Sequence, residues 1–105
     1  MAVVSLPARF AAGTATTSEV TVLTVPGGET DIVTSVTFDN ITDVANQVTL
    51  KMAGTNFAKN LDLAPRSLVV LDFKQVLNTA ETITVQASVN NGVTYFISGV
   101  KVTSI

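Results

Sequence analysis

The chain has 105 residues and contains no cysteine, no histidine and no tryptophan. Without cysteine it has no disulfide, no thiolate metal site and no cysteine nucleophile. Without histidine it also lacks the commonest general base and a common zinc ligand. These absences exclude histidine-based hydrolytic triads and zinc enzymes. We therefore expect a protein that is not an enzyme and that carries no cofactor.

Charged residues are scarce as well. They make up 13% of the chain, against about 25% in an average soluble domain, and the six basic residues are scattered singly. No basic stripe is available to follow a nucleic-acid backbone, so we expect no nucleic-acid partner. One interpretation of the uncharged surface is a β protein that places Thr on its pleated faces. The interpretation we favour is a surface buried against other subunits, because interface cores are depleted in charge.

Long apolar runs are missing too. No stretch of about 18 apolar residues is available to span a bilayer, and residues 1–7 lack the basic start and long apolar run of a signal peptide. We therefore expect no membrane partner and synthesis in a cytosol. A chain of this length builds one hydrophobic core, so the sequence predicts a single domain.

The chain does contain a series of short strand patterns separated by turn residues. A Thr/Val-rich run at 20–25 leads into Pro26-Gly27-Gly28, and a second run alternates Ile32, Thr34, Val36 and Phe38. Further strands are predicted at 48–52, 57–63, 68–71, 83–89 and 93–102. About eight strands of this length are typical of an all-β fold, a single β-sandwich or jelly roll of antiparallel strands, with a closed barrel as the alternative.

Three local patterns make sharper predictions. The continuous apolar run 68–71 is typical of a strand covered on both faces. Asn90-Asn91-Gly92 predicts a tight hairpin, because Asn-Gly supplies the positive φ angles of a type I′ turn. A helix is expected at most as a single turn near residues 74–77.

The first 18 residues form the least regular segment. Its apolar residues lie within 3–10, and residues 11–18 are small and polar. We expect residues 1–18 to be an arm and linker and residues 19–105 to be the β-sandwich domain, while an edge strand of the same sheet stays open as the alternative. An arm of this kind adds to the sheet edge of a neighbour. The candidate residues for such a contact are Val3, Val4, Leu6, Arg9 and Phe10.

No catalytic, cofactor-binding or metal-binding residue is predicted. Asp39, Asn40 and Asp43 cluster in one loop, but their spacing matches no calcium loop, and such residues favour turns because their side chains hydrogen-bond the backbone. No spacing selects a pair of carboxylates for glycoside hydrolysis. Tyr95 is the one tyrosine, so support for carbohydrate stacking is thin; we expect Tyr95 and Phe96 to divide between the core and the opposite sheet face.

Several segments together resemble the small β-sandwich virion proteins of tailed bacteriophages. The motifs are Val22-Leu23-Thr24-Val25-Pro26-Gly27-Gly28, Ile32-Val33-Thr34-Ser35-Val36, Asn40, Val48-Thr49-Leu50, Ile83-Thr84-Val85-Gln86-Ala87 and Ile97-Ser98-Gly99-Val100. They mark a turn and core strands across residues 20–102, so they are more specific for the fold than for a place in the virion.

The resemblance implies a non-enzymatic virion structural protein, made in the cytoplasm of the host bacterium. A capsid decoration protein that binds and stabilises the head shell is the first expectation, with the major capsid protein as partner and the first residues as the anchor. We also expect a homo-oligomer, a trimer, since closed cyclic symmetry is usual. The alternative is a tail or head-fibre accessory domain that binds carbohydrate on the host surface.

Overall fold

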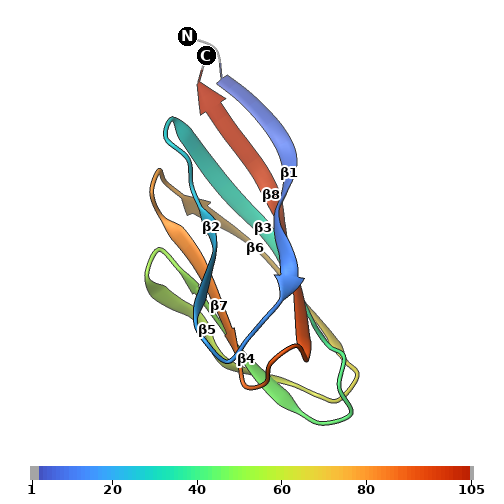
Figure 1. The fold of residues 1–105 in the computed structure, drawn as a ribbon. Helices are drawn as coiled ribbons and strands as arrows, with labels where there is room; N and C mark the ends of the chain where they lie inside the picture. Colours follow the sequence, from blue (N-terminus) through green and yellow to red (C-terminus); the bar gives the residue numbers. More distant parts are fainter. Residues whose placement is uncertain (1–2, 105) are drawn as a thin grey trace.

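The computed structural model describes residues 3–104, which form eight strands and no helix (Figure 1). Accordingly, this part of the chain holds no helix long and apolar enough to cross a membrane. The strands are β1 (Val3–Thr14), β2 (Val20–Thr24), β3 (Glu29–Asn40), β4 (Asn46–Met52), β5 (Thr55–Leu63), β6 (Leu68–Leu77), β7 (Thr82–Ala87) and β8 (Val93–Ser104).

The strands form two antiparallel sheets of four. Sheet I has the order β1-β8-β3-β6, and sheet II has the order β2-β7-β4-β5. The chain changes sheet at each connection except that between β4 and β5, so most neighbours in a sheet are far apart in sequence. Eight strands in this order make a double-sheet jelly roll. The predicted all-β sandwich is therefore confirmed, and the closed barrel is not the fold.

The core lies between the two sheets. Strand residues that alternate inward supply it, and sixteen hydrophobic residues are buried there. Sheet I contributes Val36, Phe38 and Ile97, and sheet II contributes Leu50, Ile83 and Val85, all at most 1% exposed. The expected division of Tyr95 and Phe96 is confirmed, since Tyr95 is buried and Phe96 is 48% exposed.

Sheet I is longer than sheet II, which gives the molecule dimensions of 52 × 21 × 18 Å. Strands β1, β3 and β8 each have 12 residues, whereas β2 and β7 have 5 and 6. The described ends of the chain lie together at one end of sheet I, where β1 and β8 pair (Figure 1). Sheet I thus extends at this end beyond the short strands of sheet II.

The expected arm needs correction, because residues 3–14 are strand β1 of sheet I. They pair with β8 over its whole length, from Val3 opposite Ser104 to Thr14 opposite Thr94. Phe10 packs against the core. The small residues continue the strand rather than ending it: a Cβ at Gly13 would lie 3.0 Å from the Tyr95 hydroxyl, so glycine makes room for that ring. The alternative of an edge strand is the arrangement that the structure has.

Two turn predictions are wrong. Residues 74–77 continue β6 and form no helical turn. The Asn90-Asn91-Gly92 segment does not close a hairpin, because β7 lies in sheet II and β8 in sheet I. Asn91 has a positive φ of 60°, and Gly92 is needed there for lack of space, because a Cβ would lie 2.6 Å from a Val89 methyl group.

The predicted turn at Pro26-Gly27-Gly28 is confirmed as a tight connection. Gly28 has a φ of 76°, and the Glu29 amide donates to the Pro26 carbonyl at 3.3 Å. The strands on either side belong to different sheets. The turn therefore carries the chain across the sandwich.

Candidate interaction surface

The outer face of sheet I carries most of the exposed apolar side chains of the strands. The inward neighbours on these strands are buried in the core, so the alternate residues point outward. Two rows of side chains cross all four strands in register, in the order β1, β8, β3, β6. The rows are Ala12, Phe96, Thr37, Val70 and Pro7, Val100, Ile32, Val76. We call these eight residues the apolar face.

The apolar face is exposed most strongly along β6. Val70 is 49% exposed and Val76 45%, and Leu68 beside them is 60% exposed. This corrects the prediction for residues 68–71: the apolar run is covered on one side only, since β6 alternates between exposed and half-buried residues. The inward residues Val69 and Leu71 pack against the core. The outward ones have no covering layer within residues 3–104.

Three charged side chains lie between the two rows: Arg9 on β1, and Asp72 and Lys74 among the outward, exposed residues of β6. Arg9 on β1 is in register with Ser98, Ser98 with Ser35, and Ser35 with Asp72 on β6. Arg9 and Asp72 therefore occupy opposite edges of the same face, about three strand spacings or roughly 14 Å apart. Both are exposed, and neither forms an ion pair within the described residues.

The outer face of sheet II is polar. A depression of about 190 Å³ there is lined by amide and hydroxyl side chains, namely Gln47, Thr49, Asn60, Gln86 and Ser88, with Ala87. Much of their hydrogen-bonding capacity is already used: the Gln47 side chain donates to Asp62 at 2.9 Å, and that of Gln86 donates to the Thr17 carbonyl at 2.8 Å. No aromatic ring lines this depression.

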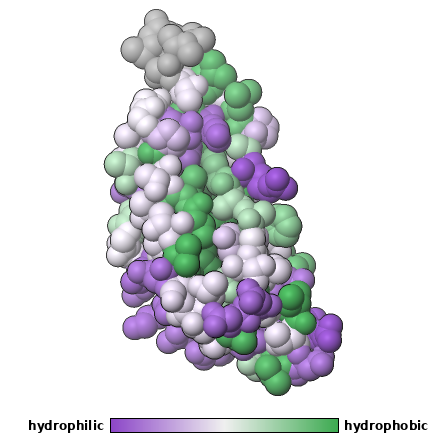
Figure 2. All heavy atoms as spheres, in the orientation of Figure 1, coloured by the Kyte–Doolittle hydropathy of each residue, from purple (hydrophilic) through white to green (hydrophobic). Residues whose placement is uncertain are grey.

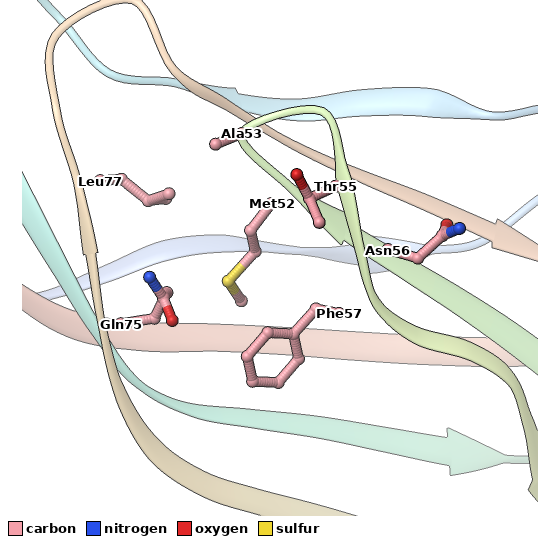
Figure 3. A pocket seen from close by; sticks show the side chains of 7 residues that line it. All are labelled: Met52, Ala53, Thr55, Asn56, Phe57, Gln75 and Leu77. Carbon is pink, nitrogen blue, oxygen red and sulfur yellow. The ribbon is translucent and has the colours of Figure 1, made fainter.

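A second hollow of about 260 Å³ lies where the β4-β5 hairpin approaches β6. Figure 3 shows the Met52 thioether and the Phe57 ring beside it, with the Gln75 amide across from them. The Phe57 and Phe73 rings lie 4.5 Å apart between centroids and link β5 to β6 at the open edge of the sandwich. The hollow is small and mixed in character, and nothing in it is arranged for chemistry.

The surface also differs between the two ends of the molecule. In the view of Figure 2, hydrophobic residues gather along the middle of the molecule over β2, and hydrophilic residues gather around the loops farthest from the termini.

Within the described residues, no group of three or more His, Cys, Asp or Glu side chains is placed to hold a metal ion.

The five residues predicted for subunit contact do not form one surface. Val4 and Leu6 point to the sheet-II side of sheet I, where Leu6 is 57% exposed. Arg9 points to the outer face, and Phe10 turns inward at a bulge in β1. The side chain of Val3 lies outside the described part of the chain.

The Asp39 to Asp43 loop is a structural unit. Asn40 is fully buried, and its amide nitrogen donates to the carbonyl groups of Val44, Leu63 and Ala64 at 2.8, 3.2 and 3.1 Å. Its side-chain oxygen accepts from Thr42, 2.7 Å from the hydroxyl. Asn40 thus holds the loop between β3 and β4 against the end of β5, as the preference of such residues for turns predicts.

The sequence reasoning missed a buried acid, Asp31 on β3. Its side chain is 0% exposed, and no N–H or hydroxyl group of the described residues donates to either carboxylate oxygen or to the buried Oε2 atom of Glu29. Burial, followed by a hydrogen bond to Glu29 and the charge of Glu29, raises the pKa of Asp31 to about 7, against the opposing effect of Lys101. Two carboxylates do not bond to each other, so the proton on Asp31 supplies the donor.

No protein-family model matches the chain, and no curated protein matches its sequence. Two solved structures share its fold. One is a chain of the T13 viral particle of infectious bursal disease virus, with a TM-score of 0.58 and 12% identity over 97% of this chain and 30% of that chain. The other comes from Bacillus endospore appendages, with a TM-score of 0.60 and 16% identity over 98% of this chain and 89% of that chain.

Identities this low establish a common fold alone. This chain spans less than a third of the viral chain that it matches. The fold shared with both structures is the two-sheet β-sandwich described above.

Proposed function

We propose that the chain is a non-enzymatic structural protein of a virion, a capsid decoration protein of the bacteriophage kind that binds the shell built by the major capsid protein. The observation that carries the proposal is the uncovered apolar face of sheet I. Exposed apolar patches of this kind mark sites of protein contact, and the scarcity of charge is what interface cores require.

The fold is consistent with this role. It is shared with a subunit of a virus particle and with a subunit of endospore pili, both of which are assemblies. The pili are described as disulfide-linked, whereas this chain has no cysteine. This chain therefore offers no cysteine for a link of that kind.

The residues near the chain ends supply a contact to the shell in this proposal. Val4 and Leu6 lie where sheet I extends beyond sheet II, and Leu6 is exposed there. The exposure of Leu6 at a projecting end of the molecule supports the anchor role expected for the first residues, now as part of a strand.

A second candidate function is the binding of a host glycan by the depression on sheet II. The amide and hydroxyl groups there favour it, since sugars are bound through such groups. The absence of an aromatic ring from the lining of the depression argues against it, because ligand sites usually combine polar groups with an apolar surface.

Counting the copies of this polypeptide in purified virions tests the proposal. We expect many copies per particle, and we expect the purified protein to cosediment with shells that lack it. A few copies at the tail tip, together with measurable glycan binding, would instead establish the second candidate. Absence from the particle would refute both.

A further inference from the structure

We infer that the outer face of sheet I binds the same face of a second copy of this chain, around a two-fold axis that lies between the two faces and runs along the strands. The inference rests on the proposed function, because it names one partner of the apolar face. It also predicts a dimer as the basic unit, and not the trimer expected from the sequence.

The placement of Arg9 and Asp72 provides the first argument. They lie in one row at opposite edges of the face, Arg9 on β1 and Asp72 on β6. Rotation by 180° about an axis along the strands, between β8 and β3, places the β1 edge of one copy over the β6 edge of the other. Arg9 of each copy then lies over Asp72 of the other copy, so that two opposite-charge pairs form at once, with Lys74 two residues farther along β6 from each pair.

The apolar rows match under the same rotation. Ala12 of one copy comes to lie over Val70 of the other, and Pro7 over Val76. In the middle of the face, Val100 comes to lie over Ile32. Phe96 comes to lie over Thr37, so three of the four pairings join two apolar side chains, and the arrangement is closed, as a two-fold interface requires.

The geometry and size of the face also fit a second copy. Twisted sheets pack face to face with their strands about 30° apart. At the edges of the two faces, this angle displaces opposed residues along the strands by about one residue. The long Arg9 side chain spans that distance. Four strands about 4.8 Å apart and about ten residues long give a face of roughly 600 Å² in outline. The side chains make its accessible area larger, close to the roughly 800 Å² per partner of a stable interface.

Charge reversal tests the pairing. Sedimentation equilibrium of the full chain at low salt should give a dimer, and Arg9→Asp or Asp72→Arg alone should weaken dimerisation about tenfold, because each creates two like-charge contacts. The double variant R9D/D72R should recover the wild-type affinity. Mixing the two single variants should also recover it, because their heterodimer regains both opposite-charge pairs.

Two further variants separate the face from general effects of charge and folding. Lys59→Asp makes the same kind of charge change at an exposed residue of β5, outside the face, and should leave the dimer unchanged. Phe96→Thr removes an exposed ring from the centre of the face and should abolish the dimer, while circular dichroism stays that of wild type, since Thr suits a strand.

A monomer at 100 µM protein, or a trimer, overturns the inference, and so does a failure of the mixed variants to pair. A wild type that is monomeric yet cosediments with shells would overturn this inference and leave the proposed function intact. A dimer that is absent from virions would leave this inference intact and refute the proposed function.

Discussion

Replacing the buried acid Asp31 by asparagine should make the protein more stable above pH 7 and remove a large part of the pH dependence of its stability. Asp31 is 0% exposed, and no N–H or hydroxyl group of the described residues donates to its carboxylate oxygens. Asparagine has nearly the same shape but carries no charge at any pH. It therefore mimics the protonated acid, which the buried site prefers.

The sign of the effect follows from where the proton binds. The pKa of Asp31 rises from 3.8 to about 7 on folding, so between these values the folded state holds a proton that the unfolded state has released. The contribution of this proton to the stability of the folded state is complete below pH 3.8, falls as the pH rises, and is gone above about pH 7. At about 1.4 kcal/mol per pH unit, the loss between pH 5 and pH 8.5 is roughly 3 kcal/mol as an upper bound.

Urea unfolding followed by circular dichroism at pH 5 and pH 8.5 measures this difference. Wild type should lose up to roughly 3 kcal/mol between the two conditions through this group, which corresponds to a melting temperature lower by up to about 13 °C for a chain of this size. Asp31→Asn should lose much less. Lys101→Met should raise the pKa of Asp31 further, because the charge of Lys101 lowers it. The loss of stability with rising pH should then continue to a higher pH than in wild type.

Asp62→Asn is the matched control, because Asp62 is exposed and asparagine keeps an oxygen that accepts from Gln47. It should follow wild type at both pH values. The reasoning is refuted if Asp31→Asn follows wild type with a constant offset, or if it is the less stable protein at pH 8.5. Either result would mean that Asp31 is charged in the folded state throughout this range.

Three further predictions concern stability. Gly99→Ala should lower the free energy of unfolding by about 3 kcal/mol or more, because the added Cβ would meet the Ile32 carbonyl oxygen of the neighbouring strand. Gly27→Ala is the control and should be tolerated, since nothing lies within 4 Å of its Cβ. Equal melting temperatures for the two variants would contradict this. Asn40→Ala should cost about 2–3 kcal/mol in urea unfolding, because it removes the side-chain donor to the buried Leu63 carbonyl and the partly buried Ala64 carbonyl, while exposed Asn56→Ala should change little. Removal of residues 3–14 should leave a chain with no cooperative thermal transition, since it strips β1 from β8 along its whole length; a folded truncated protein would show that β1 is dispensable.

The sequence predicted the fold class because the strand pattern is local. The runs at 48–52, 57–63 and 93–102 lie within β4, β5 and β8. In the first of them Val48, Leu50 and Met52 alternate as a half-buried sheet requires. The pairing of the strands is not local. The Asn90-Asn91-Gly92 turn has the composition of a hairpin, yet the strands on either side join different sheets, because the partners of β8 are the distant strands β1 and β3.

The buried acid was missed because of a bulge. The alternation of Ile32, Thr34, Val36 and Phe38 predicts one common face, but the register shifts between Val33 and Ser35. One extra residue moves the following side chains to the opposite face. Val33 and Val36 are therefore both buried, Ile32 points outward, and Asp31, two residues before Val33, is carried inward. No pattern within the strand predicts where such a bulge falls.

The apolar run at residues 68–71 predicted a strand covered on both faces, and this prediction is wrong for the single chain. A run of apolar residues on both faces of a strand is typical of a strand that is covered on both sides, and β6 within a single chain is covered on one. The composition of the run is then explained if another molecule supplies the second cover. Val70 and Val76 lie on the side that a second copy would cover, so the sequence pattern and the charge-matched face lead independently to the same contact, and the Arg9 and Asp72 variants decide whether it forms.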